Sequence, residues 1–305
     1  MSIPVKYVDA ANIALIVLSC GLAHVFPYEL LVFSYAVLGP AHYLTQISWL
    51  HDRKYFVNSR LIAPALLAFT FLLIVFYFKT SPLVFTALVL TAAFGMAFIF
   101  VLPDKAPLRL GATALVAAVL ALEVYIGQMA LFIAVLLPTV LHVFVFTASF
   151  MWVGATKSHK TTAYIAFYTL LIGALTFLVP QGLSDTPDLD GVKFFQPVSL
   201  YMQSVMGFTP TAEKQIFGFL SFAYTYHYLN WFSKAEVIHW NRIPRARLLA
   251  IIAIYILAFG IYLYSYRIGF LIILFLAQAH VILEFPLNIR TFGTIAGSFR
   301  KPKPA

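Results

Sequence analysis

Long apolar runs, separated by short polar segments, repeat along the whole chain. A helix needs about 20 apolar residues to cross the hydrocarbon core of a bilayer. An open sheet would leave backbone groups unpaired in lipid, so helices are the expected spanning elements. We therefore predict an all-α, polytopic membrane helix bundle of about ten transmembrane helices, formed as one domain over residues 1–305. The runs lie at 10–27, 29–50, 61–79, 82–102, 108–126, 128–153, 162–180, 214–233, 246–265 and 268–287.

The polar segments between these runs differ in their positive charge. With the N-terminus in the cytoplasm, the loops 51–60, 103–109, 154–161 and 234–247 face inward together with both termini. Of the 20 Lys and Arg residues, only Lys79, Lys193, Lys214 and Arg267 then fall outside the inner segments. This asymmetry is what the positive-inside rule describes. We expect both termini to be cytoplasmic, in a multi-pass protein of a bacterial inner membrane.

The composition supports a membrane protein and excludes several other classes. Hydrophobic residues make up 62% of the chain and charged residues 10%, whereas a soluble domain carries about 25% charged residues. The net charge of +9 lies beside the apolar runs, so we interpret it as an orientation signal toward membrane lipids and predict no nucleic-acid partner. The lone Cys20 excludes a disulfide or thiolate cluster within one chain.

Four of the eight histidines lie inside predicted helices, where ionisable groups are costly and mark function by default. They are His42, His142, His227 and His280. Their helices all run from outside to inside, and each imidazole is about 10–18 Å from the inner helix end at about 1.5 Å per residue. Neutral imidazole is a good ligand for iron, zinc and copper, so we predict that the four share a metal ion. The alternatives are hydrogen-bonded core histidines or a proton path. Glu284, four residues after His280, lies on the same helical face and is a candidate outer partner of the metal ligands.

The remaining histidines and the known catalytic motifs add little. His24, His51, His159 and His239 fall near helix ends, which favours an interfacial role. The chain contains no glycine-rich phosphate loop, no Ser–His–Asp signature and no His-Glu-x-x-His motif. Two further classes stay open: a haem-binding electron-transfer subunit with axial histidines, and a proton-coupled transporter in which buried His and Glu relay protons.

The sequences around the four histidines resemble one known family, the Brp/Blh-type bacterial and archaeal β-carotene dioxygenases. The matching segments follow in the family's order across nearly the whole chain. They are Gly39-Pro40-Ala41-His42, Val140-Leu141-His142-Val143-Phe144, Tyr226-His227-Tyr228-Leu229 and His280-Val281-Ile282-Leu283-Glu284-Phe285. The resemblance implies a helical membrane enzyme that holds non-haem Fe(II) on histidines and cleaves a carotenoid with O₂ to give retinal.

The family's ligand positions fall on His42, His142 and His227, so the resemblance implies that these three histidines bind the metal. The second member of the family's histidine pair falls at Trp231, so we predict His280 as the fourth ligand. Gln46 stands where the family has an acid beyond its first histidine, and we predict that it joins Glu284 as an outer partner of the metal ligands.

Aromatic residues near the candidate ligands could line a slot for a rigid polyene. A carotenoid or similar apolar lipid would enter sideways between helices and react there with O₂. The alternative is ordinary helix packing. The residues are Tyr43, Trp49, Phe144, Tyr226, Tyr228 and Trp231.

Overall fold

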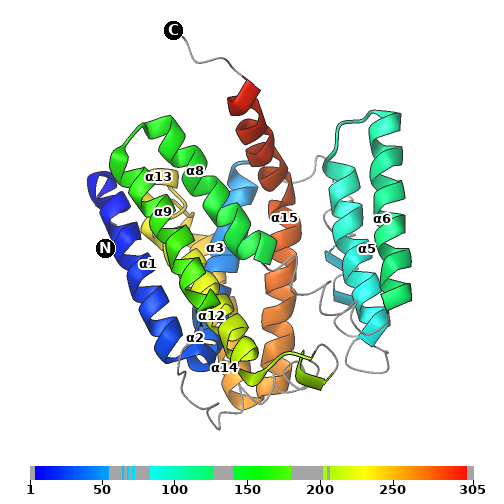
Figure 1. Ribbon diagram of the computed structural model, residues 1–305, viewed down its shortest axis with the longest axis horizontal. Helices are drawn as coiled ribbons and strands as arrows, with labels where there is room; N and C mark the ends of the chain where they lie inside the picture. The colour runs from blue at the N-terminus through cyan, green and yellow to red at the C-terminus, as the bar shows by residue number, and fades with distance from the viewer. Residues whose placement is uncertain are drawn as a thin grey trace. The chain divides into compact units, whose positions relative to one another are not determined.

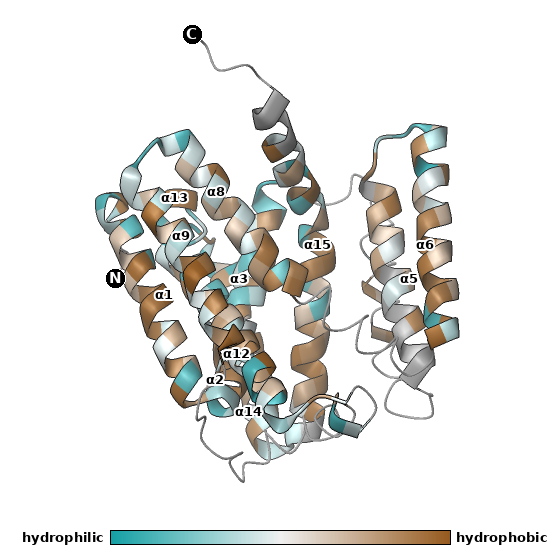
Figure 2. Ribbon diagram, viewed as in Figure 1, coloured by the Kyte–Doolittle hydropathy of each residue, from teal (hydrophilic) through white to brown (hydrophobic). Residues whose placement is uncertain are grey.

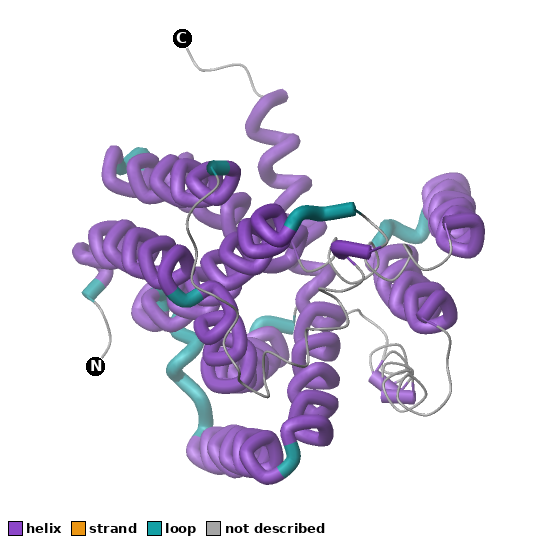
Figure 3. Tube along the Cα trace, turned by 60° about the horizontal axis from the view of Figure 1, so that its bottom comes forward, coloured by secondary structure: helices purple, strands orange, loops and turns teal. Residues whose placement is uncertain are grey.

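Helices dominate the computed structural model, and the described residues contain no β-strand (Figures 1 and 3). The prediction of an all-α fold is therefore confirmed for this part of the chain. Of the predicted spans, 61–79 and the first half of 128–153 lie almost entirely outside the described residues. The structure describes residues 4–54, 64, 67, 68, 71, 72, 83–126, 140–179, 202–204 and 207–300.

Within this part of the chain, 6 helices are long and apolar enough to cross a membrane. This finding supports a membrane-embedded protein. The predicted total of ten spans, the cytoplasmic termini and the bacterial inner membrane stay predictions. The six spans are Val5–Val25, Pro27–Asp52, Ala106–Ile126, Thr161–Leu178, Arg245–Tyr264 and Ile268–Ile295.

The chain divides into two compact units, each built from separated stretches of sequence. Unit 1 comprises Met1–Thr45 and Val143–Ile273, and unit 2 comprises Gln46–His142 and Leu274–Ala305. The helices α3 (Gly39–Asp52) and α15 (Tyr266–Arg300) contribute residues to both units. We retain the single domain as a prediction and describe each unit by itself.

Unit 1 is organised around α12 (Pro210–Ser233). This helix packs against α1 (Val8–Val25) and α2 (Pro27–Phe33), and α1 in turn packs against α9 (Thr161–Leu175). The remaining helices of the unit are α8 (Thr147–Ser158), α13 (Ala235–Ile238) and α14 (Arg245–Tyr264). The core cluster includes Ile16, Leu170 and Phe222, whose side chains are at most 1% exposed.

The helix α12 is more polar than its neighbours, and its packing explains why. In Figure 2, α1 is largely brown, whereas α12 mixes brown with white and teal. Its buried residues include Thr225, His227 and Asn230. A helix covered by other helices can carry such groups, because protein rather than lipid surrounds them. The 24 residues of α12 are long enough to cross a bilayer. Because of its polar residues, however, α12 is not among the six helices that are apolar enough to count as spans.

Unit 2 contains the hairpin of α5 (Leu83–Val101) and α6 (Ala106–Ile126), with α5 also packed against α15. Gly95 allows the two helices of the hairpin to approach, because a Cβ at this position would lie 2.5 Å from a methyl carbon of Val116. Small residues at helix interfaces serve this purpose in membranes. On the other side of α5, Ala97 packs against Ile282, and Phe98 meets Phe285 edge-on at 6.3 Å between ring centroids.

Two π-helical turns interrupt the helices that carry predicted ligands. One, η2 (Ser34–Leu38), directly precedes α3, and Gly39 N–H donates to the carbonyl of Ser34. Pro40 follows and cannot donate a backbone hydrogen bond, so the helix resumes with a shifted register two residues before His42. The second, η3 (Leu141–Phe146), contains His142 itself. Single π turns in helices occur frequently at functional sites.

Candidate metal centre

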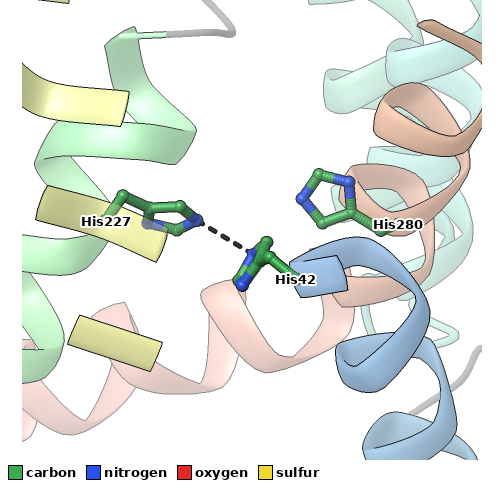
Figure 4. A group of neighbouring side chains, drawn as sticks. All are labelled: His42, His227 and His280. Atoms are coloured by element: carbon green, nitrogen blue, oxygen red, sulfur yellow. Dashed lines mark hydrogen bonds between the residues drawn. The ribbon is translucent and has the colours of Figure 1, made fainter. Parts of the chain in front are cut away.

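Two of the four predicted ligands meet within unit 1. His42 of α3 and His227 of α12 are hydrogen-bonded through their Nε2 atoms, which lie 3.1 Å apart; the dashed line in Figure 4 marks this bond. The side chains are 1% and 8% exposed. Residues separated by 185 positions are therefore brought together by packing. This pairing gives unit 1 two buried imidazole nitrogens directed at each other.

The orientation of the His227 ring is set by a hydroxyl group. Thr147 Oγ1 lies 2.7 Å from His227 Nδ1, and the same hydroxyl donates to the carbonyl of Val143 at 2.7 Å. Because Thr147 has one proton and gives it to that carbonyl, its oxygen accepts from His227 Nδ1–H. The neutral ring then carries its lone pair on Nε2, the atom that faces His42. A metal-ligating histidine is typically held in this way.

The other two predicted ligands meet within unit 2. His142 of η3 and His280 of α15 place their Nε2 atoms 3.0 Å apart, and the side chains are 3% and 2% exposed. On the far side of the His142 ring, Nδ1 lies 3.5 Å from Glu284 Oε2. Gln46 in turn hydrogen-bonds to Glu284. Glu284 and Gln46 thus lie beside His142, and their role as outer partners of a metal ligand stays a prediction.

Both pairs have a spacing that suits a transition metal. Two nitrogens bound at right angles, with metal–nitrogen bonds of about 2.0–2.1 Å, are about 3.0 Å apart. The observed separations are 3.1 Å and 3.0 Å. In unit 2, ligand atoms of His142, His280 and Glu284 all lie within 4.8 Å of one another. The donor set of imidazole with an optional carboxylate is that of non-haem iron, so the residues present fit the ion that the sequence predicts.

The same spacing does not suit axial ligation of haem within either pair. Axial nitrogens lie on opposite sides of the iron, about 4 Å apart when each bond is about 2.0 Å, with the porphyrin plane between them. Imidazole nitrogens 3.0 or 3.1 Å apart leave no room for that plane.

Three of the predicted substrate-lining aromatics surround His42. Ring centroids of Tyr228, Trp231 and Tyr43 lie 5.0, 5.4 and 5.8 Å from that of His42. The hydroxyls of Tyr43 and Tyr228 are hydrogen-bonded to each other at 2.5 Å. Gly39 makes room for this arrangement, because a Cβ there would lie 2.8 Å from the Tyr43 hydroxyl.

The other three predicted aromatics occupy different places. Tyr226 belongs to the core cluster of unit 1, where its hydroxyl lies 3.2 Å from Met151 Sδ. Phe144 packs against the same cluster and meets Phe219 at 5.3 Å. Trp49 lies in unit 2, with the guanidinium of Arg53 5.9 Å from its ring. Helix packing accounts for these three, whereas the role of all six in binding a substrate stays a prediction.

The four histidines assigned to helix ends lie outside both imidazole pairs. His24 Nε2 lies 2.9 Å from Thr176 Oγ1, and His51 is exposed beside Asp52. His159 and His239 follow the last residues of α8 and α13 in the left-handed conformation, with φ of 54° and 58°. Thr147, by contrast, was not predicted as a site residue. The residues around Thr147 in the sequence give no signal of this role, because other helical threonines also bond to carbonyls of their own helix.

Comparison with protein-family models, with curated proteins and with solved structures found no match for this chain. The family resemblance therefore stays a prediction, as does the meeting of all four histidines at one shared ion.

Proposed function

We propose that this chain is a membrane-embedded non-haem iron oxygenase, which holds Fe(II) on buried histidines and oxidises or cleaves an apolar lipid with O₂. A carotenoid is the candidate substrate. The observation that carries this proposal is the pairing of buried imidazoles, with Nε2 atoms 3.1 Å apart in unit 1 and 3.0 Å apart in unit 2. Hydrogen bonds between core histidines have the same spacing, so the iron content is the property that separates the two interpretations.

The residues beside each pair prepare the imidazoles for metal binding. Thr147 accepts the Nδ1 proton of His227, and Glu284 lies beside Nδ1 of His142. The His227 ring thus presents a bare Nε2, which is the form of histidine that binds a metal. A ferrous ion bound there would supply the redox chemistry with O₂.

The surroundings of the histidines exclude water and favour an apolar substrate. His42, Tyr43 and Tyr228 are each 1% exposed. A polyene lying near His42 would contact aromatic faces of Tyr228 and Trp231, which bind extended apolar groups well. Because the pair lies on helices within a membrane-embedded unit, a lipid-soluble substrate can approach without entering water.

Elemental analysis of the purified protein tests iron binding. We expect about one iron per chain in the wild type, and a loss to about a tenth or less in His142→Ala and in His227→Ala, since ligands and their close partners each govern metal affinity. His51→Ala is the matched control, because this exposed histidine at the end of α3 should not alter the iron content. Iron absent from the wild type, or unchanged in both ligand variants, contradicts the proposal.

Conversion of substrate tests the oxygenase reaction separately. Iron-loaded protein in lipid nanodiscs should bleach the absorption of β-carotene in the presence of O₂ and not under argon. The His142→Ala variant serves as the inactive reference. Bleaching that proceeds equally with this variant would show that the reaction does not use the histidine site.

A further inference from the structure

Asn288 is the most unusual polar residue of unit 2. It lies in the apolar span Ile268–Ile295 of α15, and its side chain is 0% exposed. Neither its amide nitrogen nor its amide oxygen has a hydrogen-bond partner among the residues that the structure describes. Burying an amide without partners is costly. A group that supplies both a donor and an acceptor would remove this cost.

Two further buried polar groups of unit 2 are incompletely bonded. Glu284 lies one helical turn before Asn288, on the same face of α15, and is 2% exposed. Gln46, 3% exposed, hydrogen-bonds to Glu284. Within the described part of the chain, Gln46 Oε1 accepts no hydrogen bond, and Glu284 Oε2 has His142 Nδ1 3.5 Å away but accepts no hydrogen bond from it. The buried face of α15 thus carries a group of polar atoms with unused hydrogen-bonding capacity.

The other buried asparagines among the described residues behave differently. In unit 1, Asn12 Oδ1 accepts from Ser233 Oγ at 3.2 Å, and Asn230 Oδ1 lies 3.4 Å from the hydroxyl of Tyr226. These side chains are 3% and 8% exposed. The fold therefore provides hydrogen-bond partners for buried amides elsewhere. Because the Asn288 amide has no partner among the described residues, a bound ligand would explain its burial.

The chemistry of the free atoms specifies that ligand. An amide offers two donors and an acceptor, so a hydroxyl, which both donates and accepts, can satisfy both of its ends. A carbonyl could use only the amide nitrogen, and a cation only the oxygen atoms. Glu284 Oε2 and Gln46 Oε1 add acceptors for the hydroxyl proton.

We propose that Asn288, with Glu284 and Gln46, forms a buried binding site for a hydroxyl group, carried either by an otherwise apolar lipid or by a resident water molecule. In its lipid form, the proposal deepens the proposed function by making a hydroxylated polyene the preferred substrate over a hydrocarbon one. Only this choice of ligand rests on the proposed oxygenase, because the site itself consists of residues that need no metal.

Pigment binding to metal-free protein in nanodiscs tests the lipid source. Zeaxanthin and β-carotene share one polyene, but only zeaxanthin carries hydroxyls. We expect the wild type to bind zeaxanthin about tenfold more tightly, the effect of one buried hydrogen bond of ordinary strength. Asn288→Leu and Gln46→Leu should reduce this ratio to about twofold or less. Asn230→Leu, which alters a buried asparagine of unit 1, should leave the ratio unchanged.

Infrared difference spectra in H₂¹⁸O test the water source on the same samples. An O–H stretching band that shifts with the isotope, and that is lost in Asn288→Leu but kept in Asn230→Leu, assigns the hydroxyl to water. Equal affinity for both pigments together with no Asn288-dependent water band overturns the proposal. In that case Asn288→Leu should also raise the Tm, because it removes an unsatisfied amide. Since the protein is metal-free, these outcomes do not depend on whether it binds iron.

Discussion

At the scale of single residues, the His227 ring depends on one hydroxyl contributed by another helix. Thr147 receives the Nδ1 proton of His227 while giving its own proton to Val143. Thr147→Val keeps the side-chain shape and removes the acceptor. We expect the affinity for Fe(II) to fall about 10–100-fold, the usual effect of losing an outer partner of a metal ligand. Competition with a fluorescent chelator measures this change.

The control for this substitution is Thr169→Val. Thr169 lies on the exposed face of α9 and bonds only to the carbonyl of Ile165 in its own helix. Its removal should leave Fe(II) affinity within about twofold of the wild type, since surface changes away from a site have small effects. A Thr147→Val variant that binds iron as tightly as Thr169→Val would show that the hydroxyl does not orient the ring.

At the scale of elements, the polar content of a helix follows its surroundings. The apolar helix α6 contains Leu110, Leu115 and Tyr125, which are 71%, 58% and 88% exposed in the protein and suit a lipid environment. The helix α12 is enclosed by its neighbours and buries His227 and Asn230. Amphipathic patterning is weak in both cases, because lipid and the protein interior are similarly apolar.

The hairpin of α5 and α6 yields a prediction on stability. Gly95→Ala should lower the free energy of unfolding by about 1–3 kcal/mol, the usual cost of overpacking, because the new methyl group would lie 2.5 Å from Val116. Adding Val116→Ala should restore most of the loss by freeing the space. Chemical unfolding in detergent micelles measures both variants.

Gly111→Ala on α6 is the matched control for the hairpin. A Cβ at Gly111 meets nothing within 4 Å, so alanine should be neutral or stabilise the helix by up to about 1 kcal/mol. If Gly95→Ala behaves like Gly111→Ala, the close approach of α5 and α6 is incorrect.

At the scale of the whole molecule, the distribution of basic residues predicts the orientation in the membrane. The α8–α9 turn is expected inside and the α14–α15 turn outside. The substitution Cys20→Ser removes the single cysteine of the chain. In that background, His159→Cys places a thiol in the α8–α9 turn, and Ser265→Cys places one in the α14–α15 turn. We expect a membrane-impermeant maleimide to label intact cells at position 265 and to label position 159 only after lysis. The reverse pattern would invert the topology.

The sequence by itself determined the helical membrane architecture and the candidate ligands. Length and hydropathy are local properties, so α1, α6, α9 and α14 match predicted spans closely. The four histidines stand out because a polar group inside an apolar run is visible without any knowledge of packing. The i, i+4 relation of His280 and Glu284 is equally local.

Only the tertiary structure decided which groups meet. His42 pairs with His227 and His142 with His280, across separations of 185 and 138 residues. Thr147 beside His227 and Asn288 without a partner among the described residues carry no distinguishing pattern in the sequence. The physical reason is that a hydrogen bond or a metal site depends on ångström-scale positions of side chains from distant segments. Those side-chain positions depend on how whole helices pack against one another. The hydropathy of a segment indicates only whether that segment is buried in protein or lipid.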